Sequence, residues 1–308
     1  MTRKIFGDAL TAYAALNPSV VVLTADVASS VMVTAFAQKY PDRFFNVGIA
    51  EAGMVDTAVG FALGGMIPFA NTFAGLLIRA TEQIRTCVAY ANTNVKLVGS
   101  FAGLSNFKDG PTHHSILDVA IMRAMPNMIV LVPSDSIEAR KMIPLMAEHE
   151  GPVYIRISRA EMPIIFEENH SVEIGKGQVV RDGKDISLIA NGHMLSRALE
   201  AADKLSTQGV KARVVNLPTV KPIDAELIVK CAEETRGMVT CEEHTVIGGL
   251  GSAVAEVLVK GCPVPVEMVG IADRFTETAL DHDSLMDAYG MSVDEIVQAA
   301  QRVMLKQD

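Results

Sequence analysis

Short apolar runs that alternate with helix-like patterns constrain the fold of this chain most strongly. Residues 20–26, VVVLTAD, are apolar almost throughout, as in strands that are buried on both faces of a sheet. Similar runs recur along the first half of the chain at 44–48, 67–73, 95–101, 128–134 and 153–158. Helical patterns lie at 3–16, 51–63, 76–91, 116–123 and 136–149. This alternation predicts βαβ units, and hence a mostly parallel sheet that helices cover on both sides.

A second unit repeats the alternation on a smaller scale after a polar connector, poor in strand patterns, at residues 166–185. Strands are expected near 186–190, 212–216, 237–241 and 265–269, and helices near 194–208, 224–235, 250–260 and 292–304. A chain of 308 residues suits about two domains. We therefore predict an α/β protein with two domains, each a mostly parallel sheet flanked by helices, at residues 1–165 and 185–308 with a linker at 166–184.

Charge and hydropathy exclude several classes of partner. The formal net charge of -9 argues against a nucleic acid or an anionic membrane, because both call for basic patches. The uncharged stretch from Thr57 to Ile78 is interrupted by Gly64-Gly65 and Pro68, so we interpret it as buried core and not as a membrane span. The N-terminus is charged at once and lacks the apolar core of a signal peptide, so a cytoplasmic protein is expected.

The cysteines give no indication of a disulfide framework or a metal site. Four cysteines are spread along the chain, without a CxxC pair and without a neighbouring histidine at metal-ligand spacing. We therefore expect reduced thiols and no metal ligands in this chain.

One carboxylate, Glu51, lies among small and apolar residues in 46-NVGIAEAGMVDTAVGFALGG-65. Between Arg43 and Arg79 the one other charge is Asp56. An acid in such surroundings holds its proton more strongly, because desolvation disfavours the charged form, and it therefore suits acid–base work on a buried cofactor ring. The alternative is an exposed acid on the first turn of a helix, where the macrodipole favours negative charge. The residues alone leave both interpretations open.

Two adjacent histidines lie in 108-KDGPTHHSILD-118, on a turn ahead of a helical pattern. A turn in this place can direct side chains into a cleft from the carboxyl end of a strand. Ser115 and Asp118 resemble a capping box for the following helix. Packing or a local hydrogen bond is the commoner role of a single histidine, and we assign that role to His114 and not to His113.

Two other segments carry candidate binding chemistry. Arg156 and Arg159, in 156-RISRAEMP-163, end the last strand of the first unit, and their planar guanidinium groups suit a phosphate. An ordinary solvated pair of charges is the alternative. The Gly-rich turn 248-GGLGSAV-254 leads into a helix, but Val254 stands at the last position of the G-x-G-x-x-G pattern. We therefore discount a dinucleotide site.

The order of motifs along the chain resembles that of the transketolase family. VGIAEA is followed by NTF, then by RATEQIR, DGPTH, MPNMIVLVPSD and SRAEMP. Residues 1–165 look like the pyrimidine-binding domain of transketolase and residues 185–308 like its C-terminal domain, so the resemblance covers nearly the whole chain. The same pair of domains occurs in deoxyxylulose-phosphate synthase and in the β subunits of 2-oxo-acid dehydrogenases.

The resemblance implies that thiamine pyrophosphate is the cofactor. Glu51 matches the acid that hydrogen-bonds N1′ of its aminopyrimidine ring, so it is the first catalytic candidate. Phe73 matches an aromatic residue that lines the pyrimidine pocket. Leu76 or Leu77 stands where a second aromatic residue would stack on that ring, and we assign Leu76 to the pocket. An apolar contact can replace such stacking in part.

The resemblance also implies a sugar-binding site. Asp109 and His113 match positions that contact the sugar's hydroxyl groups near the reacting carbons, which makes His113 the second catalytic candidate. The terminal phosphate of the sugar would be held by Arg3, Ser30 and Arg159. Two departures favour an unusual donor or acceptor sugar: Phe101 replaces a second active-site histidine that helps bind phosphate, and Lys108 replaces an acidic residue.

A domain of the family is missing from the sequence. Full-length transketolases begin with a domain that binds the diphosphate through Mg²⁺ with a GDG motif, and no GDG occurs in this chain. The resemblance therefore implies the C-terminal half of a split enzyme, active only with an N-terminal subunit that supplies most of the Mg²⁺ contacts. A β dimer within an α2β2 tetramer is the expected assembly, because closed two-fold arrangements are the commonest.

The implied reaction is the transfer of a two-carbon ketol unit between a ketose, phosphorylated or unusual, and an aldose. The alternatives are the β subunit of a 2-oxo-acid dehydrogenase and a catalytically silent structural partner of the same fold. DGPTH, together with the three residues assigned to the phosphate, favours the sugar substrate. The presence of Glu51, Asp109 and His113 together argues against a silent partner.

Overall fold

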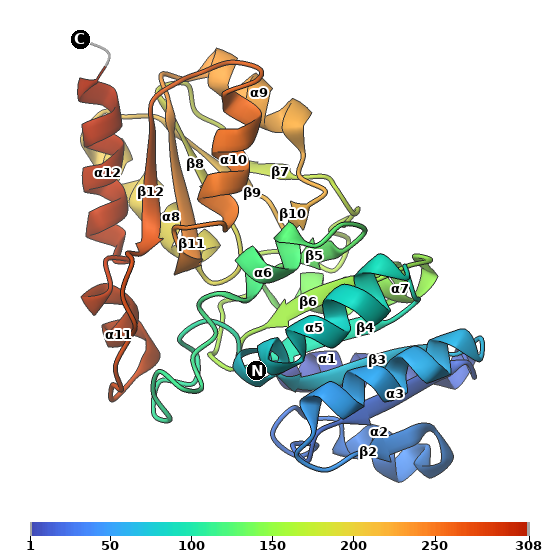
Figure 1. The fold of residues 1–308 in the computed structure, drawn as a ribbon. Helices are drawn as coiled ribbons and strands as arrows, with labels where there is room; N and C mark the ends of the chain where they lie inside the picture. The colour runs from blue at the N-terminus through green and yellow to red at the C-terminus, as the bar shows by residue number, and fades with distance from the viewer. Residues whose placement is uncertain (1, 307–308) are drawn as a thin grey trace.

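The computed structural model describes residues 2–306, which form two α/β units that lie one beside the other (Figure 1). The first unit is built on a seven-stranded sheet and the second on a five-stranded sheet. This confirms the predicted fold class of two domains with mostly parallel sheets flanked by helices.

The first sheet is parallel apart from one edge strand. Its spatial order is β10 (Thr219–Lys221), β5 (Ile129–Leu131), β6 (Val153–Ile157), β4 (Lys96–Ser100), β3 (Ile67–Phe73), β1 (Val20–Thr24) and β2 (Phe44–Asn46). β10 pairs with β5 in antiparallel register, and the pairs among the other strands are parallel. The carboxyl ends of these parallel strands therefore lie along one edge of the sheet.

Helices bury both faces of the first sheet. One face carries α1 (Thr2–Leu16), α2 (Thr34–Lys39) and α7 (Ser136–Glu148). The other carries α3 (Glu51–Leu63), α4 (Ala74–Leu77), η2 (Ile78–Ala80), α5 (Thr81–Gln83), η3 (Ile84–Tyr90) and α6 (Asp118–Ala124), while η1 (Pro41–Arg43) leads into β2. Val20 and Val22 of β1 pack on the first face, and Val21 and Leu23 on the second. A strand buried on both faces explains why the run from residue 20 is apolar without alternation.

The second sheet repeats this architecture. Its order is β12 (Val266–Ile271), β11 (Met238–Thr245), β8 (Ile186–Ala190), β9 (Ala212–Asn216) and β7 (Gln178–Arg181), with β7 antiparallel to β9. One face is covered by α8 (Met194–Thr207), α11 (His282–Ala288) and α12 (Val293–Leu305), and the other by α9 (Ala225–Glu234) and α10 (Leu250–Leu258).

Several short elements differ from the sequence prediction. β7 lies inside the connector that was expected to be poor in strands. It was not predicted because its four residues are exposed or half-exposed and form no apolar run. β10 comes from the second half of the chain but completes the first sheet. The helix predicted over 76–91 forms in pieces that pass from α through 3-10 to π geometry. α2 and α11, of six and seven residues, are too short to show a helical period.

The uncharged stretch from Thr57 to Ile78 belongs to the core of the first unit, as expected. It runs from the middle of α3 through β3 and α4, and the residues of β3 are buried with the exception of Ile67. No helix within residues 2–306 is long and apolar enough to cross a bilayer. The cysteines are free thiols, as their spacing predicts.

Buried polar contacts join the two units. The carboxylate of Glu243 accepts a hydrogen bond of 2.6 Å from the Leu104 amide, and its main-chain carbonyl accepts one of 2.8 Å from Arg156. Elsewhere along the same boundary, Ser134 Oγ lies 2.7 Å from Asn216 Oδ1. Because each contact satisfies groups that water cannot reach, separation of the units would be costly.

Lys96 is fully buried at the start of β4 and should contribute strongly to stability. Its ammonium donates to the side chain of Asn94 (2.6 Å) and to the carbonyls of His149 and Gly151 (both 2.7 Å). Lys96→Met would remove these donors and leave buried acceptors unsatisfied, at a cost of ~1–3 kcal/mol each. We expect the free energy of unfolding, measured by urea denaturation, to fall by ~2–4 kcal/mol.

The control for this prediction is Lys4→Met, which removes an exposed lysine paired with Asp8 four residues along the helix. Exposed pairs of this kind contribute only ~0.3–0.5 kcal/mol. Equal losses of unfolding free energy in the two variants would show that the hydrogen bonds of Lys96 to its three acceptors do not contribute to stability as predicted.

Candidate active site

The candidate residues from distant parts of the sequence gather at the carboxyl edge of the first sheet. They follow or end five adjacent strands: Glu51 after β2, Ser30 after β1, Phe73 at the end of β3, Phe101 after β4 and Arg159 after β6. Ligands in open parallel sheets bind at this edge, because loops from neighbouring strands converge there. The fold therefore explains why these five positions can form one site.

Glu51 is the first residue of α3 and is almost completely buried, with 3% of its side chain exposed. Its Oε2 lies 3.4 Å from Nη1 of Arg79, whose own side chain is 66% exposed. The sequence surroundings indicated an acid without a charged neighbour. In the structure Glu51 does have a counter-charge, because the fold brings Arg79 close to it. The alternative interpretation was an exposed acid on the first turn of a helix. Glu51 does lie on the first turn of α3, but its side chain is buried.

Aromatic and aliphatic side chains lie beside the start of α4. The rings of Phe73 and Phe101 are tilted against each other with centroids 4.1 Å apart, and the ring of His113 lies 6.4 Å from Phe73. Leu76 is half-buried, whereas Leu77 is fully buried in the core beneath α3. Of the two leucines, Leu76 is thus the one whose side chain is free to contact a ligand.

Two guanidinium groups lie close to the ring of Phe101. Arg3 stands 4.4 Å and Arg159 5.2 Å from the centroid of its ring, within the range of cation–π attraction. Arg3 also donates to the backbone carbonyl of Ser30, and Arg159 donates to Asn106 Oδ1 at 2.8 Å. Burial, together with the nearby charge of Arg159, lowers the pKa of Arg3 to about 10, so Arg3 stays positive at neutral pH. The arrangement suits an anion, since like charges held together are relieved by a negative ligand.

The segment between β4 and α6 carries Asp109 and His113. Asp109 is exposed, and His113 is half-buried with its Nδ1 3.0 Å from the hydroxyl of Thr112. Gly75, which was not among the predicted site residues, lets this segment approach α4. A Cβ atom there would lie 3.2 Å from the carbonyl oxygen of His113 and 3.3 Å from that of His114. The signal was a glycine directly after the NTFA stretch that ends β3.

His114 has a structural role, as expected. It is buried, and its Nδ1 forms a 2.6 Å hydrogen bond with the hydroxyl of Thr276 in the second unit. Burial lowers the pKa of His114 below the ordinary histidine value, which favours the neutral ring. His113 thus lies at the candidate site, and His114 lies at the boundary of the two units.

Arg156 does not belong to an anion site, in contrast to one of the interpretations of its motif. The guanidinium is 6% exposed and binds Asp118 through Nε at 2.8 Å, and it also donates to the carbonyls of Ser115 and Glu243. The predicted capping box is wrong for the same reason. α6 begins at Asp118 with Leu117 as its N-cap, and the Asp118 carboxylate is occupied by Arg156 and Tyr154.

The glycine-rich turn before α10 is occupied by a side chain of the protein itself. The carboxylate of Glu242 accepts hydrogen bonds from the amides of Leu250 (2.7 Å) and Gly251 (2.8 Å). A nucleotide phosphate would have to displace this carboxylate from the helix N-terminus. The arrangement agrees with the exclusion of a dinucleotide site.

Two family models match this chain. The transketolase pyrimidine binding domain matches residues 1–164, and the transketolase C-terminal domain matches residues 175–299.

Related proteins match over almost their whole length. The 6-deoxy-6-sulfo-D-fructose transketolase subunit SqwH of Clostridium sp. (strain MSTE9) is 42% identical over 98% of this chain and 94% of its own. A putative transketolase C-terminal section from Methanocaldococcus jannaschii is 40% identical over 99% of this chain and 96% of its own. A solved structure described as a split gene transketolase, inactive beta4 tetramer, has a TM-score of 0.92 and 44% identity, and the match covers 99% of this chain and 98% of that one. These similarities do not favour the 2-oxo-acid dehydrogenase alternative.

Proposed function

This chain belongs to the transketolase family, and we propose that it is the C-terminal (β) subunit of a split enzyme that moves a two-carbon ketol unit from a ketose to an aldose. The observation that carries the proposal is the convergence of Glu51, Phe73, Phe101 and Arg159 on one sheet edge. An acid, an aromatic wall and a cationic subsite are the parts that such a transfer requires from this half of the enzyme.

The residues at this edge fit the aminopyrimidine ring of thiamine pyrophosphate. Glu51 offers a buried carboxylate whose one charged partner within residues 2–306 stands at 3.4 Å, so an oxygen can still bind a ring nitrogen. Phe73 and Leu76 lie on β3 and α4, which both pack against α3, and supply apolar walls. The cofactor contributes the carbon nucleophile and the electron sink. Glu51 holds the proton at the ring nitrogen, and the partner subunit supplies most contacts to Mg²⁺.

The substrate we propose is a sugar that ends in an anion. Arg3 and Arg159 supply two positive charges, and the half-buried Ser30 adds a hydroxyl donor next to the Arg3 contact. Phe101 cannot donate a hydrogen bond, so recognition rests on charge more than on a full set of donors. A sulfonate, which is a weaker hydrogen-bond acceptor than phosphate, suits such a subsite, and one relative is named for a sulfo sugar. Asp109 and His113 orient the hydroxyl groups near the reacting carbons.

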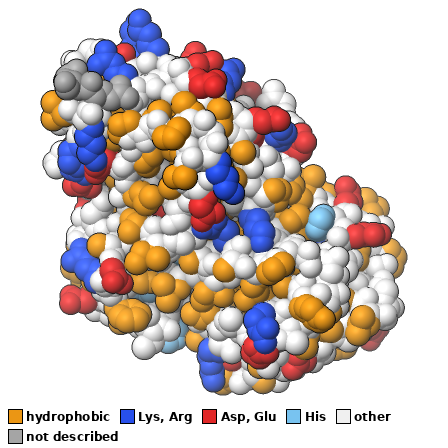
Figure 2. Space-filling view, turned by 45° about the horizontal axis from the view of Figure 1, so that its top comes forward, with side chains coloured by type: hydrophobic (Ala, Val, Ile, Leu, Met, Phe, Trp, Pro, Cys, Tyr) orange, Lys and Arg blue, Asp and Glu red, His pale blue; other side chains and the backbone are white. Residues whose placement is uncertain are grey.

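Self-association and the N-terminal subunit complete the proposal. Large apolar side chains are exposed at both ends of α3, with Ile49 at 76% and Leu63 at 77%, and the exposed face between them carries Gly53, Asp56, Thr57 and Gly60. Figure 2 shows many apolar side chains on the surface between scattered charges. Such a helix is covered in an assembly, which supports a β dimer within an α2β2 tetramer. A cytoplasmic location stays a prediction.

Calorimetric titration of thiamine pyrophosphate and Mg²⁺ tests the proposed function. We expect no saturable binding to this chain alone and saturable binding once an N-terminal transketolase subunit is co-purified with it. A screen of ketose donors, with and without a terminal phosphate or sulfonate, then identifies the substrate. Absence of cofactor binding in both preparations would favour a catalytically silent structural partner.

Phe101→His should make the anion subsite more suitable for phosphate. A neutral hydrogen bond contributes ~0.5–1.5 kcal/mol, so kcat/KM for a sugar phosphate should rise ~2–10-fold in the assembled enzyme. The matched control is Phe101→Leu, which removes the ring without adding a donor. If both variants behave alike with sugar phosphates, the ring and not the missing donor determines the substrate.

A further inference from the structure

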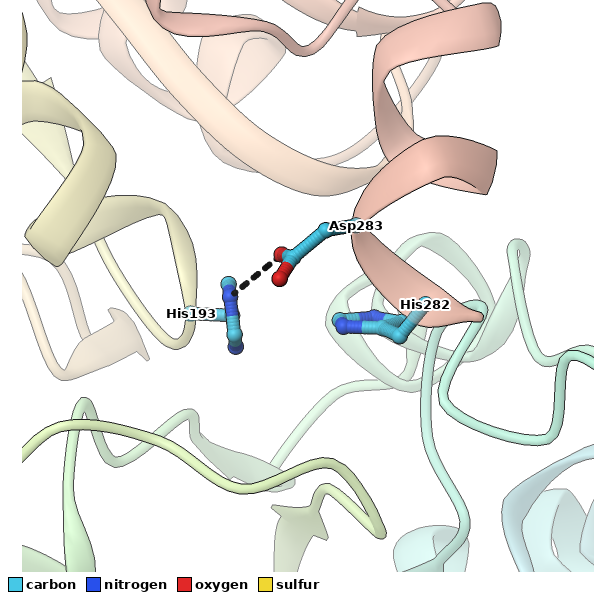
Figure 3. A group of neighbouring side chains, drawn as sticks. All are labelled: His193, His282 and Asp283. Atoms are coloured by element: carbon cyan, nitrogen blue, oxygen red, sulfur yellow. Dashed lines mark ion pairs between the residues drawn. The ribbon is translucent and has the colours of Figure 1, made fainter. Parts of the chain in front are cut away.

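A cluster of metal-ligating side chains lies in the second unit and shares no residue with the candidate active site. His193, which immediately precedes α8, faces His282 and Asp283, the first two residues of α11 (Figure 3). One potential ligand atom from each residue lies within 4.8 Å of those of the other two. Eighty-nine positions separate the two histidines, so spacing along the sequence could not reveal the group.

The geometry of the three side chains is more typical of a metal-binding site than of a packed core. The two imidazole rings are nearly perpendicular, at 84°, with centroids 4.8 Å apart. Nε2 of His193 stands 3.7 Å from a carboxylate oxygen of Asp283, too far for a hydrogen bond. Nδ1 of His193 is buried without a hydrogen-bond partner in a side chain that is 8% exposed. A buried ring nitrogen without a hydrogen-bond partner, as Nδ1 of His193 is, is costly unless something else binds it.

The surroundings of the cluster favour a cation. Two carboxylates lie against the histidines, Asp283 beside His193 and Glu243 beside His282, and Arg197 is bound to Asp283 and to Asp287. Glu243 Oε1 lies 2.8 Å from Nε2 of His282 and fixes the orientation of that ring. Carboxylates that hold a histidine in this way recur beside protein metal ions, where they set the ring's orientation and raise its basicity.

We propose that His193, His282 and Asp283 bind a divalent transition metal of the zinc type. Two imidazoles and one carboxylate match the nitrogen and oxygen ligands of Zn²⁺, with the fourth position left to water on the exposed side of Asp283. Mg²⁺ and Ca²⁺ prefer oxygen ligands throughout, so this site is distinct in kind from the Mg²⁺ of the proposed function.

The metal would tie together the boundary of the two units. His193 and α11 belong to the second unit, and Glu243, which holds His282, also accepts the Leu104 amide from the first. Leu104 follows Phe101 by three residues, so the hydrogen bond from Leu104 to Glu243 connects the cluster to the segment that carries the anion subsite. A structural metal is the role that this position indicates.

Zinc titration of the full chain after chelator treatment tests the site. We expect a single Zn²⁺ ion per chain in calorimetry, a rise in melting temperature on addition of Zn²⁺, and no competition from excess Mg²⁺. Loss of an outer carboxylate weakens protein metal sites ~10–100-fold, so loss of a direct ligand in His193→Gln or Asp283→Asn should weaken binding ~100-fold or more.

His149→Gln is the matched control, because it removes a half-buried histidine in the first unit. Its Zn²⁺ affinity should equal that of the unmodified chain. Asp283 is 72% exposed, so Asp283→Asn should fold normally, which circular dichroism verifies. Absence of Zn²⁺ binding, or binding that survives both His193→Gln and Asp283→Asn, would overturn the proposal and leave the cluster an ion-pair network.

Discussion

Glu51→Gln should abolish ketol transfer in the enzyme assembled with its N-terminal subunit. Glutamine has the same shape but cannot hold or release a proton at the ring nitrogen of the cofactor. Loss of a positioned acid–base group costs ~10²–10⁴-fold in rate, and kcat should fall by that amount in steady-state assays. The KM for the sugar should change little, because Glu51 has no place in the anion subsite.

The fold should survive this substitution. The side chain is buried, but glutamine is neutral and keeps its shape. The one charged partner of Glu51 within the described residues, Arg79 at 3.4 Å, is mostly exposed, so the substitution leaves no buried unpaired charge. Asp56→Asn is the matched control, since Asp56 is the other acid of α3 and is exposed. Full activity of Glu51→Gln, or an equal loss in Asp56→Asn, would remove Glu51 from the chemistry.

The sequence predicted the parallel core well because its signal is local. Val20 to Leu23 are apolar on both sides of the sheet, and a run that is so short and so rich in β-branched residues favours a buried strand over a buried helix. β7 and β10 were not predicted because they are short antiparallel edge strands, each with one neighbouring strand. Antiparallel edge strands carry no continuous apolar run.

The site was predicted less evenly, because residue type does not reveal burial. Arg156 and Arg159 are three residues apart and looked equivalent, yet one is locked onto Asp118 and the other faces Phe101. Residues i and i+3 at the end of a strand point in different directions as the chain leaves the sheet. The partnership of Glu51 with Arg79 was equally invisible, since it depends on how α3 and η2 pack.

Phe101 shows how a departure from a family pattern gains meaning in three dimensions. In the sequence, Phe101 stands where the family pattern has a histidine. In the structure its backbone is in the left-handed region, at φ 58°, and its ring lies close to both Arg3 and Arg159. A bulky residue rarely adopts this conformation without support, and here the two guanidinium groups and Phe73 hold the ring from several sides. The substitution thus keeps the positive charges in place while it removes a donor.

Arg159→Ala should raise the KM for an anion-terminated ketose ~10–100-fold, with a much smaller change in kcat. In the proposed function the guanidinium contacts the end of the sugar distant from the reacting carbons. It would then bind the ground and transition states equally, and loss of such binding appears in KM. Hydrogen bonds to charged groups are worth ~1.5–3 kcal/mol, which corresponds to that factor. Arg159→Lys should recover part of the affinity, because lysine keeps the charge but not the planar fork.

A ketose without a terminal anion is the control substrate for this variant. Its KM should be the same for the unmodified enzyme and for Arg159→Ala, because no charge on it reaches the subsite. The comparison also separates a direct role from an indirect one: Arg159 holds Asn106 and flanks Phe101, so a merely structural role would disturb both substrates alike. Equal increases in KM for the two sugars would therefore assign Arg159 to the support of the segment after β4, and unchanged values for both would remove it from the site.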